Sequence, residues 1–294
     1  MSPTAIGLIC GLAAACCFGV GDFLVQALTR ERGWLPAVLG VQIVSALALV
    51  VAAMLWHGPL ALGRLDGLVL LLGSINTIGL ISLYRAFEVG KLSLVSPIAG
   101  TMGVFTLLFA WLAGQVPPTI VLPGLAAVLL GILLASLASA QGHDTRVGRA
   151  LGVGWALASA LAFGWVFFRL GDVADAVGSA WAIFGLRLVA IPWLLLAARL
   201  MRVQLRGSPD PAIATKPSRA RLFAVALLDS SGLIALAVGS VEGSVAIAAV
   251  LASAFPVVTI LLARVRLHEK LAWWQWIGVA AIVSGVIWIS AWRN

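Results

Sequence analysis

The chain has 294 residues, of which 62% are hydrophobic and only 10% are charged. A soluble domain carries about 25% charged residues, so this chain has too few to cover a water-facing globule. The composition therefore predicts an all-α integral membrane protein. The formal net charge of +8 would suggest a nucleic-acid partner in a soluble protein. Here the basic residues lie in short loops between apolar runs, where they set membrane orientation, and no nucleic acid is expected to bind.

Ten apolar segments are long enough to cross a bilayer, which takes about 20 residues in a helix. They are 4–27, 34–56, 67–86, 92–114, 120–140, 148–169, 178–199, 221–239, 243–265 and 271–292. Most connections between them are short and contain Gly, Pro or charged residues. The longest, 202–221, is rich in Pro and Arg and is expected to be mobile.

The sequence contains no pattern for a cofactor, a metal or catalysis. The three cysteines, Cys10, Cys16 and Cys17, all lie in the first apolar segment, without disulfide or metal-ligand spacing. The three histidines fall in separate loops, and no glycine-rich phosphate loop is present. No bound cofactor is expected.

The two halves of the chain resemble each other at a nearly constant offset. Phe18-Gly19 recurs as Phe163-Gly164 after 145 positions, and Gly124 and Gly131 recur as Gly278 and Gly285 after 154. Such spacing indicates an internal duplication, with repeats at 1–141 and 142–294. Because each repeat has five spans, an odd number, the second must be inverted relative to the first. This is an architecture of secondary transporters.

The positions of Lys and Arg predict the orientation of the chain. If the termini were cytoplasmic, three of these residues would be on the cytoplasmic side and fifteen on the other, with Arg187 inside a span. The protein is expected in the cytoplasmic (inner) membrane of a cell. The positive-inside rule places both of its termini outside the cytoplasm.

Two charged residues lie deep within predicted spans. A charge near the middle of a bilayer costs about 2.5–3.5 kcal/mol on insertion scales, so Arg187 and Asp229 are expected to pair or to face a cavity. Their counterparts in the first half are Gln42 and Asn76, which are polar and uncharged. We expect these four residues to meet near the midplane and to contact substrate. The alternative is a buried ion pair that only fixes helix packing.

Asp22 and Gln26 are four residues apart and share one face of the first span. Asp22 is a candidate for binding a cationic group or for carrying a proton. The alternative is a residue near the interface with no functional role. Among the aromatic residues, Trp165 lies within the sixth span beside the repeated Phe163-Gly164 and is the predicted aromatic contact for substrate.

The candidate gate is a polar interruption at the end of the third span. Tyr84, Arg85 and Glu88 lie there, and the alternative is a solvated helix end whose charges pair with Lys91. Pro97 and Pro256 are expected to interrupt the fourth and ninth spans, either as moving elements or as static kinks.

The end of the chain carries a family likeness. Segment 267–286 resembles the closing signature of EamA-type proteins of the drug/metabolite transporter superfamily, with Glu269, Gln275, Gly278 and Gly285 in the signature positions. Segment 84–97 is similar to the junction of the third and fourth helices in that family. The resemblance implies a membrane transporter driven by proton coupling or by facilitated exchange.

The sequence therefore predicts a secondary transporter that is not an enzyme. Its partners are the lipid bilayer and a small polar metabolite, such as an amino acid or an organic cation. Two alternatives remain at this stage. A lipid flippase would need a groove open to the bilayer, and an intramembrane enzyme would need a polar cluster near one membrane face. The sequence does not specify an oligomeric state.

Overall fold

The computed structural model describes residues 2–58, 67–90, 92–115, 119–136, 146–201, 219–267 and 273–291. These residues form helices and connecting turns, and none of them lies in a β-strand. The helices are α1 (Pro3–Arg32), α2 (Trp34–His57), α3 (Gly67–Val89), α4 (Leu92–Gly100), α5 (Met102–Leu112), the short 3₁₀ helix η2 (Thr119–Val121), α6 (Leu122–Ser136), α7 (Arg146–Val177), α8 (Ser179–Leu200), α9 (Arg219–Val241), α10 (Val245–Ala252), α11 (Phe255–Leu267) and α12 (Trp273–Ala291).

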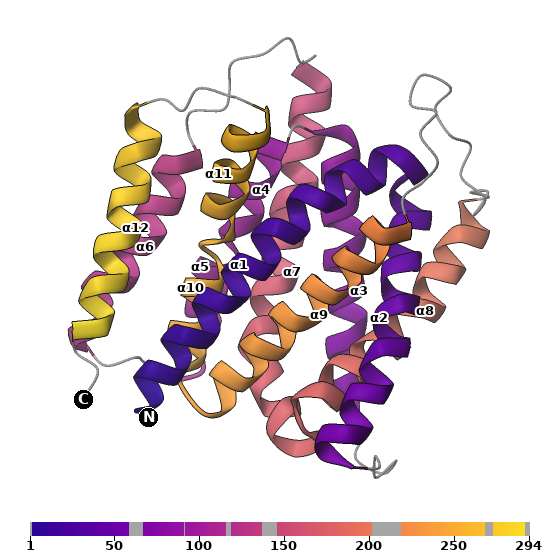
Figure 1. The fold of residues 1–294 in the computed structure, drawn as a ribbon, viewed down its shortest axis with the longest axis horizontal. Coiled ribbons are helices and arrows are strands. Elements are labelled where there is room, and N and C mark those ends of the chain that lie inside the picture. The colour runs from indigo at the N-terminus through magenta and orange to yellow at the C-terminus, as the bar shows by residue number, and fades with distance from the viewer. Residues whose placement is uncertain are drawn as a thin grey trace.

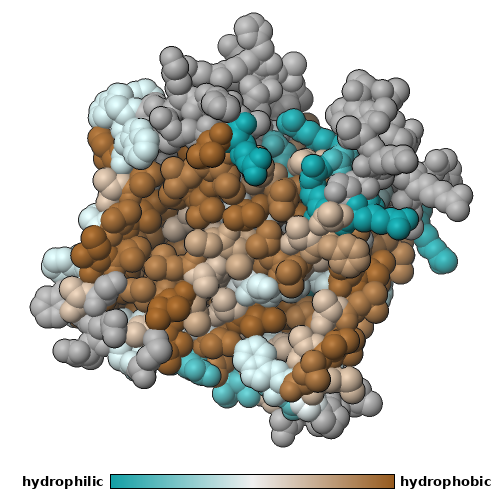
Figure 2. Space-filling model, viewed as in Figure 1, coloured by the Kyte–Doolittle hydropathy of each residue, from teal (hydrophilic) through white to brown (hydrophobic). Residues whose placement is uncertain are grey.

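The all-helical membrane fold is confirmed. Eight helical stretches are long and apolar enough to cross a membrane. The expected spans 120–140 and 271–292 correspond to shorter apolar helices, at 119–134 and 276–289. Figure 2 shows the apolar side chains as a broad band across the molecule, with hydrophilic side chains gathered mainly along its upper edge. Figure 1 places the N- and C-terminal ends at the opposite, lower edge.

Two predicted spans differ from the structure, because 92–114 and 243–265 each form two helices instead of one. The first breaks at Thr101, between α4 and α5, and the second breaks at 253–254, between α10 and α11. Pro97 lies inside α4, which continues to Gly100, so the proline is not itself the break. Pro256 is the second residue of α11, where a helix tolerates proline because the first N–H groups have no acceptor within the helix.

The first two helices of each half are joined in the same way. Gly33 between α1 and α2 has φ 79°, and Gly178 between α7 and α8 has φ 90°. These two glycines are 145 positions apart, which is the offset found in the sequence. A positive φ is readily adopted only by glycine, so both turns depend on it.

Helices of the two halves pack against each other and run antiparallel, and each contact recurs with the halves exchanged. The ring of Phe18 on α1 lies against Gly232 on α9, and the ring of Phe163 on α7 lies against Gly79 on α3. Figure 1 shows α6 beside α12. Their glycines meet in crossed pairs, Gly124 with Gly285 and Gly131 with Gly278. Small residues at these points let the backbones approach closely, as is common between helices in membranes.

Two predictions fall on residues that the structure does not describe. The boundary between the repeats at 141/142 lies outside the described residues. So does the long connection at 202–221, except for 219–221, which begin α9.

Candidate functional site

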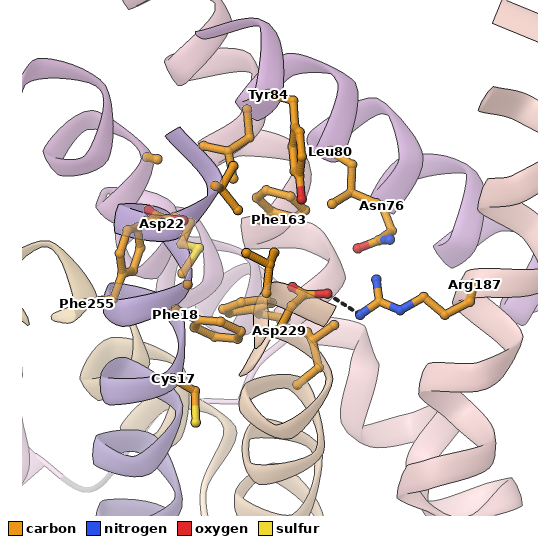
Figure 3. A pocket seen from close by; sticks show the side chains of 18 residues that line it. Cys17, Phe18, Asp22, Asn76, Leu80, Tyr84, Phe163, Arg187, Asp229 and Phe255 are labelled. Atoms are coloured by element: carbon orange, nitrogen blue, oxygen red, sulfur yellow. Dashed lines mark hydrogen bonds and ion pairs between the residues drawn. The ribbon is translucent and has the colours of Figure 1, made fainter. Parts of the chain in front are cut away.

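A cavity lies at the centre of the helical bundle. Residues of α1, α3, α4, α5, α7, α8, α9 and α11 line it, and it contains about 690 Å³ of space including its opening. Of the predicted site residues, Asp22, Asn76, Arg187 and Asp229 line this cavity, as does the candidate gate residue Tyr84. Figure 3 shows these side chains around the same space. The structure therefore brings together residues from both halves of the chain.

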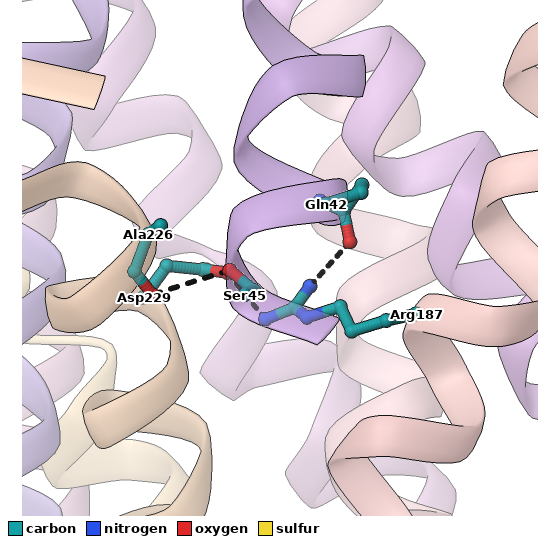
Figure 4. A network of polar contacts seen from close by, with 5 residues as sticks. All are labelled: Gln42, Ser45, Arg187, Ala226 and Asp229. Carbon is teal, nitrogen blue, oxygen red and sulfur yellow. Dashed lines mark hydrogen bonds and ion pairs between the residues drawn. The ribbon is translucent and has the colours of Figure 1, made fainter. Parts of the chain in front are cut away.

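The most deeply buried polar group of the cavity wall is the guanidinium of Arg187. This side chain is fully buried, and its Nη1 donates to Oε1 of Gln42 at 2.8 Å. Its Nη2 forms an ion pair with Oδ2 of Asp229, whose side chain is 26% exposed. Figure 4 shows Arg187 of α8 bridging Gln42 of α2 and Asp229 of α9. The predicted ion pair is present, and Gln42 lies behind it, outside the described cavity lining.

Three buried donors of this group have no hydrogen-bond partner among the described residues. They are Nε of Arg187, Nε2 of Gln42 and Nδ2 of Asn76. A buried donor without an acceptor costs about 1–3 kcal/mol. Because Arg187 and Asn76 line the cavity, a ligand oxygen could accept hydrogen bonds there.

Asp22 lies at another part of the cavity wall and has no basic partner among the described residues. It is only 8% exposed. The hydroxyl of Ser96 on α4 donates to its Oδ2 at 3.4 Å, a long hydrogen bond, and also lies 3.5 Å from the hydroxyl oxygen of Thr259. Gln26, one turn further along α1, is partly buried and does not belong to the described cavity lining.

The remaining lining is apolar and includes four phenylalanines. The ring of Phe18 stacks with that of Phe167 at a centroid distance of 5.9 Å and packs edge-on against Phe255 at 6.5 Å. Phe163 follows at 6.4 Å from Phe167. Trp165, the predicted aromatic contact, is not part of the described lining and packs instead against the hydrophobic core. Residues 163 and 167 are one helical turn apart and share a face, whereas residue 165 points elsewhere.

The candidate gate residues do not form a single group. Tyr84 is 3% exposed and reaches into the cavity, as Figure 3 shows. Arg85 forms an ion pair with Glu88 near the surface, and its guanidinium lies 5.4 Å from the ring centroid of Trp34. Lys91, the other expected partner, lies outside the described residues.

Some cavity residues were not identified from the sequence. Cys17 and Phe255 had no signal, and neither did Ser96, which bonds to Asp22 from outside the described lining, since thiol, aromatic and hydroxyl groups are common within membrane spans. Phe18 and Phe163 did carry a signal, because they recur at the repeat offset. Within the described ranges, no three His, Cys, Asp or Glu residues lie close enough together to hold a metal ion.

Comparison with known proteins supports the fold and gives a family. A crystal structure of a protein with 19% sequence identity superposes with a TM-score of 0.73, covering 98% of this chain and 97% of the other, which shows a shared fold. No curated protein sequence matches the chain. The model of the EamA-like transporter family matches residues 5–137 and again residues 150–291. Because these two matches span nearly the whole chain, the protein belongs to the EamA-like transporter family of the drug/metabolite transporter superfamily.

Proposed function

We propose that this protein is a secondary transporter that moves a small polar metabolite across the cytoplasmic membrane by alternating access. The observation that carries the proposal is the buried Arg187–Asp229 pair in the wall of a central cavity. A charge inside a membrane is costly and usually marks a substrate or ion pathway. The enclosing helices come from both halves, so this cavity is not a groove between the outer helices of one repeat.

Comparison of the two repeats indicates whether the fold itself requires the buried charges. The first half has the amides Gln42 and Asn76 at the two positions where the second half has Arg187 and Asp229. The same helical frame therefore forms with neutral residues in one half. The packing of the helices therefore does not require the charges of Arg187 and Asp229, which favours a role in binding over a role in packing.

The architecture supports movement around the cavity. We propose ten membrane-spanning helices in two inverted repeats, 1–141 and 142–294. The broken helices of the two repeats cross near the centre, where Gly100 of α4 meets Pro256 of α11 and Gly103 of α5 meets Ser253. A helix break absorbs a change of angle more easily than a continuous helix does. Rocking of one repeat against the other would open the cavity to each side in turn.

The orientation can be measured with reporter fusions. Because the sequence predicts fifteen of the Lys and Arg residues on the side opposite the termini, we expect both termini outside the cytoplasm. A periplasm-active phosphatase fused after Asn294 should be active, and a cytoplasm-only fluorescent protein at the same point should be dark. The reverse pattern would place the termini inside and contradict this assignment.

Alternating access can be followed with a native thiol in the cavity wall. Cys17 lines the cavity, whereas Cys16 beside it faces the outer surface of the bundle. In the variant Cys10→Ala/Cys16→Ala, we expect a membrane-impermeant methanethiosulfonate to label Cys17 from both sides of oriented vesicles. A transported compound from a panel of amino acids and organic cations should change the two rates in opposite directions.

The matched control is Cys10→Ala/Cys17→Ala, which retains only the lipid-facing Cys16. Its labelling by the polar reagent should be slow from both sides and independent of any metabolite. Labelling of Cys17 from one side only, unchanged by every compound, would show a static cavity and overturn the transport proposal. Changes caused by phospholipids alone would instead indicate a lipid flippase.

A further inference from the structure

The two halves of the chain differ in character at the position of Asp22. Its counterpart 145 residues later is Phe167, and the counterpart of Ser96, 153 residues later, is Ala249. Both counterparts are buried, at 3% and 0% exposure. A carboxylate with its hydroxyl partner in one half is thus replaced by an aromatic ring and a methyl group in the other.

The helix contacts next to this position are the same in both halves. The hydroxyl of Thr259 donates to the carbonyl of Gly19 at 3.1 Å, one turn before Asp22. The hydroxyl of Thr106 donates to the carbonyl of Gly164 at 3.0 Å, one turn before Phe167. The helix contacts therefore form whether the neighbouring residue is charged or apolar. Packing does not require the carboxylate of Asp22.

The charges of the cavity leave Asp22 without a counterion. Arg187 is the basic residue of the described lining, and it is already bonded to Asp229 and Gln42. Asp22 accepts a single long hydrogen bond, from a neutral hydroxyl. An unpaired charge is costly in an apolar interior, so a cationic group of a ligand would be a favourable partner for this carboxylate.

The side chains around Asp22 restrict what kind of cation fits. Phe18 and Phe255 pack edge to face, and Figure 3 shows them with Asp22 and Phe163 around the cavity. Aromatic faces attract cations and also bury apolar groups. The carboxylate of Asp22, which the hydroxyl of Ser96 positions by donating to it, accepts hydrogen bonds from N–H groups. The site thus suits an ammonium group that retains N–H and is attached to an apolar body.

We infer that Asp22, positioned by Ser96, binds the protonated amino group of a substrate whose apolar body lies among the phenylalanine rings. This inference rests on the proposed transport function and names the substrate class of the same cavity as arylalkyl amines. The Arg187 side of the cavity remains available for a hydrogen-bond acceptor elsewhere on the substrate.

A matched pair of compounds tests the inference. Phenethylamine carries the ammonium group, and N-acetylphenethylamine has the same ring and chain without the charge. With Cys17 as the remaining thiol, phenethylamine should slow its labelling, and the acetylated compound should have no effect at the same concentration. The variant Asp22→Asn loses a charge-assisted hydrogen bond to the amine. Protection of Cys17 should then need an amine concentration at least about tenfold higher.

Two further variants and one further compound test whether protection depends on the contact between Asp22 and the amino group. Ser96→Ala reproduces the residue found at the counterpart Ala249, so it should fold, and it should weaken protection by the amine severalfold. Asp175→Asn removes an exposed carboxylate of α7 that lies away from the cavity lining and should change nothing. A trimethylammonium analogue of phenethylamine should protect less well than the primary amine, because it has no N–H to donate.

Equal protection by the amine and its acetyl derivative would overturn the inference, as would unchanged protection in Asp22→Asn. The two proposals fail separately. If Cys17 is labelled alternately from both sides but amines have no effect, transport stands and the amine assignment falls. If amines protect through Asp22 while labelling stays on one side, the binding site stands and alternating access falls.

Discussion

The double substitution Arg187→Gln/Asp229→Asn is expected to leave the protein folded and to remove its transport. It gives the second half the two amides, Gln and Asn, that the first half already has at Gln42 and Asn76. Neither position of the pair then holds a buried charge whose partner has been removed, so thermal stability in detergent should stay close to that of the native protein. Removing both members of a buried ion pair avoids the large cost of leaving one charge uncompensated.

Transport should nevertheless be lost, because the cavity wall no longer offers a guanidinium. Loss of one partner of a buried charged contact costs about 2–5 kcal/mol of binding free energy, which corresponds to about 30-fold or more in affinity. The measurement is uptake or efflux by reconstituted vesicles, using the compound that changes Cys17 labelling. Transport at the native rate in a stable double variant would show that the pair serves packing alone.

The single substitutions should separate folding from function. Asp229→Asn leaves the fully buried guanidinium of Arg187 with only Gln42, and breaking a buried pair in this way destabilises by about 3–5 kcal/mol. Arg187→Gln leaves Asp229, which is 26% exposed toward the cavity, so its loss of stability should be smaller. Equal melting temperatures for both singles and the double would contradict this account of burial.

The sequence was sufficient to predict most of the spans, the two repeats and the central ion pair. The spans follow from runs of apolar residues, and the Arg187–Asp229 pair follows from the cost of isolated charges in a membrane. Both predictions depend on large free energies, of apolar burial and of charge insertion into a membrane, that a short stretch of sequence determines. The offset between the halves then predicts which polar residues are equivalent.

Which side of each helix faces the cavity and which side faces lipid could not be predicted in the same way. A span that is apolar on all sides gives no signal for which side faces lipid, so Trp165 and Phe163 were equally good candidates for the cavity. Packing decided between them, with Phe163 at Gly79 and in the cavity wall. The break at Thr101 was missed for a related reason, because it occurs where α4 and α5 cross the second repeat, not at Pro97.

A second large effect is expected from Gly131→Ala, at the contact between α6 and α12. A methyl group added at Gly131 would lie 2.6 Å from the carbonyl oxygen of Gly278 and 2.9 Å from the backbone nitrogen of Ile282. These are backbone atoms, so they cannot move aside without separating the two helices. Overpacking of this kind destabilises by about 1–3 kcal/mol, and the melting temperature in detergent should fall clearly.

The chain provides a matched control at Gly154 in α7. A methyl group there would meet no atom within 4 Å outside its own helix, so Gly154→Ala tests the effect of helix propensity alone. Alanine is favoured over glycine within a helix by about 0.5–1 kcal/mol, so Gly154→Ala should be neutral or slightly stabilising. The opposite signs of the two substitutions would assign the cost at Gly131 to helix contact. If both variants melted alike, α6 and α12 would not depend on the close approach at Gly131 and Gly278.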